Sequence, residues 1–179
     1  GAGKTTLFHS LSGLERPDSG RVLLEGEDVT GHPGKISYML QKDLLLPHKR
    51  VADNVALPLV IQGKSAREAR AEALPYFKQF GLEGTEGKYP AQLSGGMRQR
   101  AALLRTFLGS RGVVLLDEPF SALDALTKRE IHKWYLGVME QLRLTTLFVT
   151  HDIDEAVLLS DRVCILAGQP GRIAAELPI

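Results

Sequence analysis

The chain has 179 residues, of which 44% are hydrophobic and 24% are charged, the ordinary range for a soluble globular domain. Its 22 Lys and Arg residues nearly balance its 21 Asp and Glu residues, and a formal net charge of +1 disfavours a dedicated nucleic-acid binder. No apolar run is long enough to cross a bilayer and no basic-then-apolar leader opens the chain, so we expect a soluble protein that is not secreted.

Short apolar runs rich in β-branched residues predict the strands, at residues 36–40, 113–116, 146–149 and 163–166. The runs do not alternate between polar and apolar residues, which is typical of strands covered on both faces of a parallel sheet. Cys164, in the last run, is therefore expected to be a small buried hydrophobic residue, and as the sole cysteine it excludes an internal disulfide. Two further segments, 20–30 and 172–177, favour a short antiparallel piece and a late edge strand.

Helical patterns fill the chain between these strands, at residues 5–12, 65–80, 95–108, 127–142 and 153–160. Leu7 and Leu11 share a face of the first helix, and Gly13 ends it. Ser65 opens the second helix as a cap, and Pro75 predicts a kink or a division within it. Because residues from about 45 to 105 are all helical and strands flank them on both sides, we predict an α/β sheet domain with an inserted helical block.

The first six residues match the second half of the phosphate-binding P-loop pattern, in the order Gly1, Ala2, Gly3, Lys4, Thr5 and Thr6. Glycines let backbone N–H groups close around phosphate oxygens, the helix that follows offers its positive N-terminus, Lys4 neutralises phosphate charge and Thr5 ligates Mg²⁺. The alternative is a glycine-rich turn before an ordinary helix. Because Gly1 falls inside the pattern, we expect the outer glycine of the P-loop and the strand that leads into it to precede Gly1.

Two carboxylates, Asp117 and Glu118, directly follow the apolar strand at 113–116. Ligands of open α/β sheets gather at the carboxyl ends of the strands, so these acids are expected beside the phosphates. Asp117 is placed to hold Mg²⁺, and Glu118 to orient and deprotonate an attacking water. An acidic pair beside Pro119 is also typical of a simple helix start, which is the alternative.

Residues 93–100, LSGGMRQR, open a further helix with a serine and two glycines, which makes a second anion-binding helix N-terminus in one chain. This string resembles the signature motif of the ATP-binding subunits of ABC transporters. The alternative is a helix capped by Ser94 whose glycines permit close packing. Other motifs of the family follow in its order over essentially the whole chain: Gln41 resembles the Q-loop glutamine, residues 121–124 resemble the D-loop, and His151 resembles the switch histidine.

The resemblance implies a P-loop NTPase fold of the RecA-like type. Residues 1–42 and 106–179 would form the RecA-like core with its mostly parallel sheet, and residues 43–105 would form a helical subdomain that carries the signature motif. The whole chain, 1–179, would be a nucleotide-binding domain that lacks its N-terminal part.

The resemblance also implies the roles of the site residues. In this family two domains face each other head to tail, and each ATP lies between the P-loop of one subunit and the signature helix of the other. ATP and Mg²⁺ would be held in cis by the P-loop residues Gly1 to Thr6, with Gln41 and Asp117 around the metal. In trans, the γ-phosphate would be contacted by Ser94, Gly95 and Gly96. Glu118 would be the general base, His151 would stabilise phosphate charge, and Asp124 would couple the two sites.

The partners implied by the resemblance are a second ATP-binding subunit, transmembrane permease subunits and, indirectly, a substrate-binding protein. The chain would then be the ATP-hydrolysing subunit of an importer, peripheral on the cytoplasmic face of the inner membrane, with no nucleic acid expected. Leu44, Leu45 and Leu46 would either meet the permease or pack the helical subdomain.

The cargo of such an importer stays open. Residues 170–173, PGRI, resemble the nitrate, sulfonate and taurine branch, and a related branch carries thiamine precursors. His48 and Lys49 stand where many members of the first branch have an aromatic residue and an arginine. The rival hypothesis is a soluble ABC-type ATPase of DNA maintenance or translation. Only 52 residues separate Gln41 from Ser94, which is too few for the long heptad insertions of the DNA-repair members.

Overall fold

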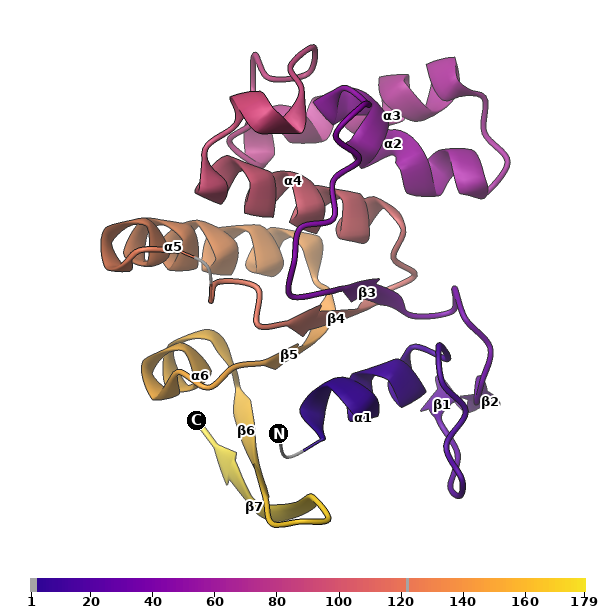
Figure 1. The fold of residues 1–179 in the computed structure, drawn as a ribbon, viewed down its shortest axis with the longest axis vertical. Coiled ribbons are helices and arrows are strands. Elements are labelled where there is room, and N and C mark those ends of the chain that lie inside the picture. The colour runs from indigo at the N-terminus through magenta and orange to yellow at the C-terminus, as the bar shows by residue number, and fades with distance from the viewer. Residues whose placement is uncertain (1–2, 122) are drawn as a thin grey trace.

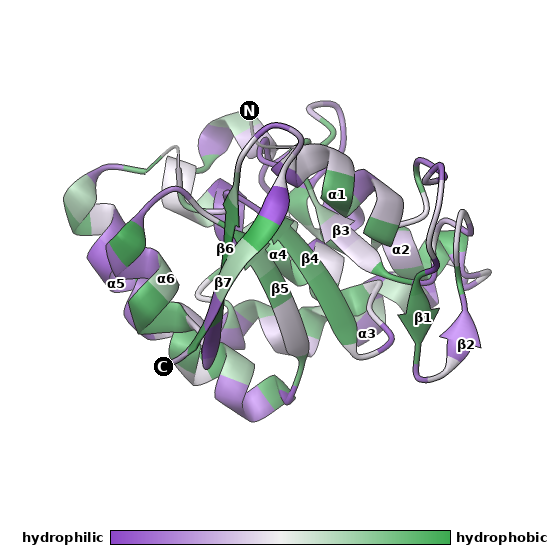
Figure 2. Ribbon diagram, turned by 90° about the horizontal axis from the view of Figure 1, so that it is seen from below, coloured by the Kyte–Doolittle hydropathy of each residue, from purple (hydrophilic) through white to green (hydrophobic). Residues whose placement is uncertain are grey.

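In the computed structural model, which describes residues 3–121 and 123–179, a parallel sheet of three strands in the order β3-β4-β5 forms the centre of the fold (Figure 1). The strands are β3 (Ser37–Met39), β4 (Val113–Asp117) and β5 (Thr145–Val149). β4 lies in the middle, and its consecutive residues from Val114 to Leu116 are all buried, so both faces of the strand are covered. Figure 2 shows its hydrophobic colour along the strand. These three predicted strands are confirmed.

Helix α1 (Lys4–Leu11) packs on one face of the sheet. Its buried residue is Phe8, which joins Leu115 of β4 in a small core, whereas Leu7 is 44% exposed. The helix ends where predicted, since Gly13 adopts a φ of +78°, which favours glycine. A Cβ on Gly13 would also lie only 2.6 Å from the His32 carbonyl carbon, so a larger residue would clash there. At its other end α1 begins after Gly3, which has no side chain with which to cap it.

A block of helices covers the opposite face of the sheet (Figure 1). It contains α2 (Val51–Ile61), α3 (Ala66–Gln79), a short 3-10 turn (Pro90–Gln92) and α4 (Gly95–Leu108). The described part of the chain has no strand between β3 and β4, so the predicted helical block is confirmed. Its core is built from residues such as Val55, Phe77 and Leu104, and it continues into the sheet at Leu116.

Helix α3 begins at its predicted cap and continues past Pro75. Ser65 caps it in both directions: the Ser65 N–H donates to Glu68 Oε2 at 3.0 Å, and the Glu68 N–H donates to Ser65 Oγ at 3.3 Å. Of the kink or division predicted at Pro75, the division is wrong, since α3 runs through this residue as one helix. Ala73 and Phe77, on either side of the proline, are both buried in the core, and this burial outweighs the hydrogen bond that proline cannot donate.

The second half of the fold returns to the sheet through α5 (Ala125–Leu142) and α6 (Ile153–Leu159) and ends in the strands β6 (Arg162–Ala167) and β7 (Arg172–Pro178). β7 confirms the predicted late strand. The expected burial of residues 163–166 in the parallel sheet is wrong, because β6 pairs antiparallel with β7 and Cys164 is exposed. An apolar run of this length fits a two-stranded ribbon as well as a buried strand, and composition alone does not separate the two.

The predicted antiparallel piece is also confirmed, as the hairpin of β1 (Leu23–Leu24) and β2 (Glu27–Asp28). Glu25 and Gly26 form its two-residue turn with φ angles of 51° and 86°, the pair of positive values that such a hairpin turn needs. Among the residues described, no helix combines the length and the apolar character needed to cross a membrane.

Candidate functional site

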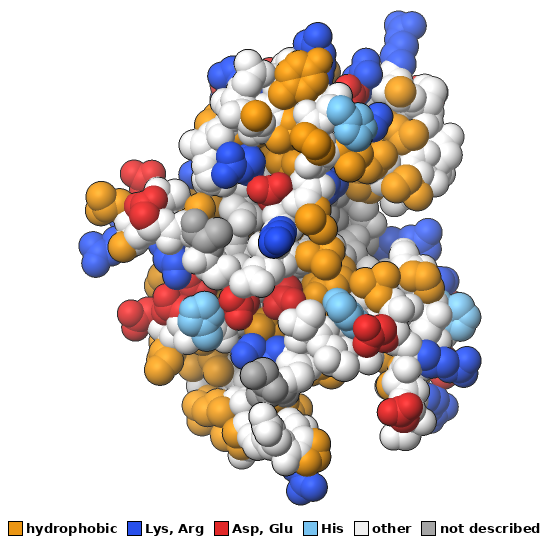
Figure 3. All heavy atoms as spheres, viewed as in Figure 1, with side chains coloured by type: hydrophobic (Ala, Val, Ile, Leu, Met, Phe, Trp, Pro, Cys, Tyr) orange, Lys and Arg blue, Asp and Glu red, His pale blue; other side chains and the backbone are white. Residues whose placement is uncertain are grey.

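Side chains from four segments of the chain meet at the carboxyl edge of the sheet. Gln41 follows β3, Glu118 follows β4 and His151 follows β5, while Thr5 lies in the first turn of α1 beside β4. Parallel strands bring their carboxyl ends to one edge, so residues far apart in sequence become neighbours there. Figure 3 shows acidic and histidine side chains gathered in a band across the middle of the molecule.

Asp117 forms the buried half of this site. Its Oδ2 accepts a hydrogen bond from Thr5 Oγ1 at 3.2 Å and another from the Tyr38 hydroxyl at 3.1 Å, and the residue is 5% exposed. Burial and the neighbouring Asp117 charge raise the pKa of Tyr38, so its hydroxyl stays protonated and donates. The carboxylate is thus held in one orientation by two donors.

Tyr38 is a site residue that sequence reasoning missed. In the register of the sheet Tyr38 lies opposite Leu115, and Asp117 is two residues further along β4. Since side chains alternate between the faces of a sheet, this spacing brings Tyr38 and Asp117 to the same face. The one clue in the sequence was the polar hydroxyl of Tyr38 in an otherwise apolar strand. Its contact with Asp117 depends on the register of β3 and β4, which the sequence alone does not give.

Glu118 is held by three neighbours at the surface end of β4. Its Oε2 accepts a hydrogen bond from Gln41 Nε2 at 3.1 Å and lies 3.3 Å from His151 Nδ1, while its backbone N–H donates to the Val149 carbonyl at 2.9 Å. Its φ of +47° lies in the left-handed region, which is costly for a residue with a Cβ. The strained backbone of Glu118 thus directs its carboxylate toward Gln41 and His151.

The N-terminus of α1 follows Gly3, the described glycine of the predicted phosphate-binding pattern. Gly3 precedes the helix with a φ of +79° and offers no side-chain cap to its first N–H groups, and a Cβ on Gly3 would meet nothing within 4 Å. Gly1 and Ala2, which belong to the same predicted pattern, lie outside the described residues. Open backbone N–H groups at a helix start fit the phosphates of a nucleotide.

The oxygen donors beside this helix start fit Mg²⁺. Thr5 supplies a hydroxyl, Asp117 a buried carboxylate and Gln41 an amide, all hard ligands. Residues 3–121 and 123–179 hold no cluster of three or more His, Cys, Asp or Glu side chains that would bind a metal ion alone. A metal here would need the phosphates as further ligands, as is usual for Mg²⁺ at nucleotide sites.

The signature residues lie apart from this group. Ser94, Gly95 and Gly96 open α4, which is on the other side of β4 from α1 (Figures 1 and 2). Ser94 Oγ caps the helix by accepting from the Met97 N–H at 3.3 Å. A Cβ on Gly96 would lie 3.2 Å from Thr127 Cγ2, so α4 packs tightly against the start of α5. One chain therefore does not bring the signature residues to Thr5.

The side chain of Asp124 caps the N-terminus of α5. Its Oδ1 accepts from the Leu126 N–H at 3.2 Å and the Thr127 N–H at 3.1 Å, and its Oδ2 accepts from Thr127 Oγ1 at 2.6 Å. These hydrogen bonds hold the pKa of Asp124 below its usual value. Its carboxylate is exposed on the same side of α5 that meets the signature glycines.

The sequence of the chain is similar to those of known ATP-binding proteins. The family model described as ABC transporter matches residues 1–121. The chain is 52% identical over 170 residues to the formylaminopyrimidine import ATP-binding protein ThiZ of Halalkalibacterium halodurans, covering 95% of this chain and 66% of ThiZ. It is 39% identical over 179 residues to the nitrate import ATP-binding protein NrtD of Synechocystis, covering 100% of this chain and 67% of NrtD. The chain thus spans about two thirds of the length of these relatives.

A solved structure extends the likeness to three dimensions. It is the dimeric post-hydrolysis state of the ATP-binding cassette MJ0796 bound to ADP and Pi, with a TM-score of 0.81 at 29% identity over 99% of this chain and 81% of that one. The expected P-loop NTPase fold is confirmed. By its motifs, its fold and its relatives, the chain belongs to the ABC transporter family, among the ATP-binding domains.

Proposed function

We propose that the protein is the ATP-binding and ATP-hydrolysing subunit of an ABC importer. The observation that carries this proposal is the carboxylate of Glu118, held between Gln41 and His151 next to the bonded pair Thr5 and Asp117. The direction of transport is supported by the relatives, since ThiZ and NrtD are both import proteins by name.

ATP would bind with its phosphates at the start of α1. The backbone N–H groups of Gly3 to Thr6 and the Lys4 ammonium group would hold the β- and γ-phosphates, together with Gly1 and Ala2 of the same pattern. Mg²⁺ held by Thr5, Asp117 and Gln41 would neutralise charge on the phosphate oxygens. Tyr38 would keep Asp117 oriented through its hydrogen bond.

Glu118 would act as the general base. A water oxygen attacks the γ-phosphorus, the bond from that phosphorus to the bridging oxygen breaks, and the water proton passes to the Glu118 carboxylate, which leaves ADP and inorganic phosphate. His151 would donate to the γ-phosphate and so stabilise its charge. Both Gln41 and His151 now contact Glu118 Oε2, so they would also hold the base in place until ATP arrives.

A second subunit would complete each site. Ser94, Gly95 and Gly96 lie at the start of α4, away from Thr5, so they could reach only an ATP bound to a partner. The similar cassette MJ0796 is a dimer in its ADP and Pi state, which supports a homodimer here. Asp124, next to these glycines, would couple the two sites, and hydrolysis would then depend on closure of the dimer.

The permease would dock beside Gln41. A cavity there is lined by residues 41–45, Gln99 and Ser121, and Leu44 is 51% exposed whereas Leu45 is buried. Leu45 thus packs in the helical block, whereas Leu44 is exposed and would contact the permease.

Residues 43–105 would form the helical subdomain between the two core parts, 1–42 and 106–179. The protein would sit on the cytoplasmic face of the membrane, and a substrate-binding protein would act indirectly.

The proposal is tested on the full-length protein. We expect Mg²⁺-dependent release of phosphate from ATP, and co-purification of a membrane permease with the tagged protein from detergent-solubilised membranes. Recovery with ribosomes or DNA and without a permease would overturn the transport role, and absence of ATP turnover in the permease complex would overturn the enzymatic role.

A further inference from the structure

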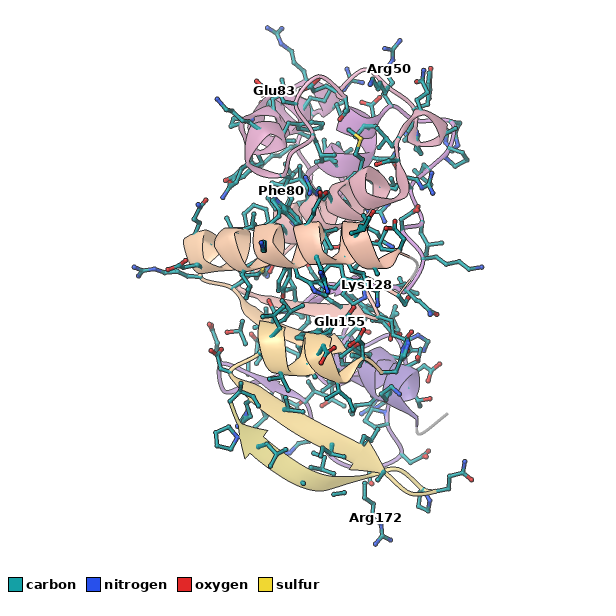
Figure 4. The ribbon with its side chains drawn as sticks, turned by 90° about the vertical axis from the view of Figure 1, so that its left-hand side faces the viewer. Arg50, Phe80, Glu83, Lys128, Glu155 and Arg172 are labelled. Atoms are coloured by element: carbon teal, nitrogen blue, oxygen red, sulfur yellow. The ribbon has the colours of Figure 1, made fainter. Side chains whose placement is uncertain are left out.

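A cluster of ionisable side chains lies between α5 and α6, next to the segment that carries His151. Figure 4 shows Lys128 of α5 and Glu155 of α6 pointing toward one another. Lys128 Nζ lies 3.0 Å from Glu155 Oε1, and Glu155 is 2% exposed. His132 Nε2 lies 3.4 Å from the same oxygen. The proposed function uses none of these three side chains.

Both carboxylate oxygens of Glu155 have polar neighbours. A buried carboxylate is costly unless it is paired and hydrogen-bonded, and Glu155 has both, since Thr150 Oγ1 donates to its Oε2 at 2.7 Å. Burial opposes a charge on Lys128, but the carboxylates of Glu155 and Asp152 outweigh it and raise the pKa of Lys128. The Glu155 N–H, followed by the Lys128 ammonium group, lowers the pKa of Asp152.

These contacts converge on the two residues that flank His151. Thr150 Oγ1 donates to Glu155 and also accepts from the Asp152 N–H at 3.0 Å. Asp152 Oδ1 caps α6 by accepting from the N–H groups of residues 154 and 155, and its Oδ2 lies 3.3 Å from Lys128 Nζ. The His151 side chain itself is 65% exposed, so packing does not fix it. Its position depends on the turn formed by its neighbours.

We propose that Lys128 and Glu155 are positioning residues, which hold the Thr150–Asp152 turn so that His151 reaches Glu118. Lys128 lies in the first turn of α5, where its N–H donates to the Asp124 carbonyl at 2.9 Å. The Lys128–Glu155 pair therefore also connects the turn that carries His151 to the start of α5, where Asp124 lies. This inference rests on the proposed ATP hydrolysis, in which His151 acts on the γ-phosphate.

The test compares Glu155→Gln and Thr150→Val with the wild type in the full-length protein. Both remove contacts behind His151 and leave the phosphate site intact, so we expect kcat to fall about 10- to 100-fold with the KM for ATP within about twofold. In a His151→Ala background neither variant should lower kcat further, because residues that act through His151 are not additive with it. Lys128→Arg should retain most of the activity.

Asp53→Asn is the matched control, since it breaks the Arg70 ion pair within the helical block and should leave kcat unchanged. Full additivity with His151→Ala, or an unchanged kcat in folded Glu155→Gln, would overturn the proposal. If Glu155→Gln does not fold, the nearly isosteric Thr150→Val decides in the same way.

A readout without turnover separates this inference from the proposed function. The imidazole NMR signal of His151, assigned by its loss in His151→Ala, should shift in Thr150→Val and stay in place in Asp53→Asn. An inactive wild-type protein would overturn the proposed function, whereas an unmoved His151 signal would overturn the positioning role.

Discussion

Glu118 carries two separable properties, its carboxylate and its left-handed backbone, and three substitutions distinguish them. Glu118→Gln removes the charge and keeps the shape. Glu118→Ala removes the whole carboxylate but keeps a Cβ at a φ of +47°, and Glu118→Gly removes the Cβ as well. We expect all three variants to bind ATP and to lose turnover by about 10²- to 10⁴-fold, because the proton acceptor is gone.

The stability of the variants follows from the backbone. Glu118→Ala and Glu118→Gly lose the same contacts with Gln41 and His151, so the difference in stability between them comes from the backbone. A left-handed residue with a Cβ costs about 1–2 kcal/mol, and the greater freedom of glycine in the unfolded chain offsets about 0.5–1 kcal/mol. The glycine variant should therefore be more stable than the alanine variant by about 1 kcal/mol, or about 2–4 °C in Tm.

Steady-state phosphate release and thermal unfolding measure the two effects on the same samples. Turnover of Glu118→Gln at the wild-type rate would remove Glu118 from the role of general base. A glycine variant no more stable than the alanine variant would refute the claim that the site stores backbone strain.

Three further predictions concern residues around the site. Gly13→Ala should lower the free energy of unfolding by about 2 kcal/mol or more, because its Cβ would clash at 2.6 Å in addition to the strained φ; Gly34→Ala, strained but with open space, should cost less in the same urea titration. Tyr38→Phe removes one hydrogen bond from Asp117, worth about 1 kcal/mol, and should raise the Mg²⁺ concentration for half-maximal turnover about fivefold; an unchanged requirement would contradict this role. The depressed pKa of Asp124 contributes stability that is present above its unfolded-state value of 3.8 and is lost as the pH falls through its folded-state pKa, so Asp124→Asn should flatten the fall of Tm in acid, as followed by circular dichroism.

The sequence was informative wherever a local pattern decides the structure. Apolar runs predict β3, β4 and β5, and the carboxyl end of β4 predicts the place of Asp117 and Glu118. Gln41 and His151 were expected at the same site from the resemblance to the ABC family, and both contact Glu118. The capping box at Ser65 and the glycine stop at Gly13 are local as well, and both form as expected.

Features that depend on distant partners could not be predicted in this way. Tyr38 reaches Asp117 only through the register of β3 and β4, and Lys128 meets Glu155 only through the packing of α5 against α6. Cys164 was expected to be buried, but the partner of its strand is the ribbon neighbour β7. The side-chain pattern of a segment says little about which other segment it meets, and these contacts are set by tertiary packing.

The separation of α4 from α1 leads to a last prediction, which tests whether the signature residues act on a partner's ATP. Gly95→Asp places a carboxylate in the first turn of α4, where the helix dipole favours it, and a Cβ at Gly95 would meet only Leu123 Cδ2 at 3.7 Å. The helix should stay folded while the new charge repels the γ-phosphate, so Gly95→Asp should be inactive alone, like Glu118→Gln.

Mixing these two inactive variants gives the decisive result. In a heterodimer the Glu118→Gln and Gly95→Asp changes fall together in one composite site, and the other site carries neither. If half of the dimers are mixed and each has one intact site, roughly a quarter of the wild-type turnover should return on mixing. Sites built within single chains would stay inactive at every mixing ratio, because each chain would keep its own defect, and that outcome would refute the assignment of Ser94, Gly95 and Gly96 to the partner's nucleotide.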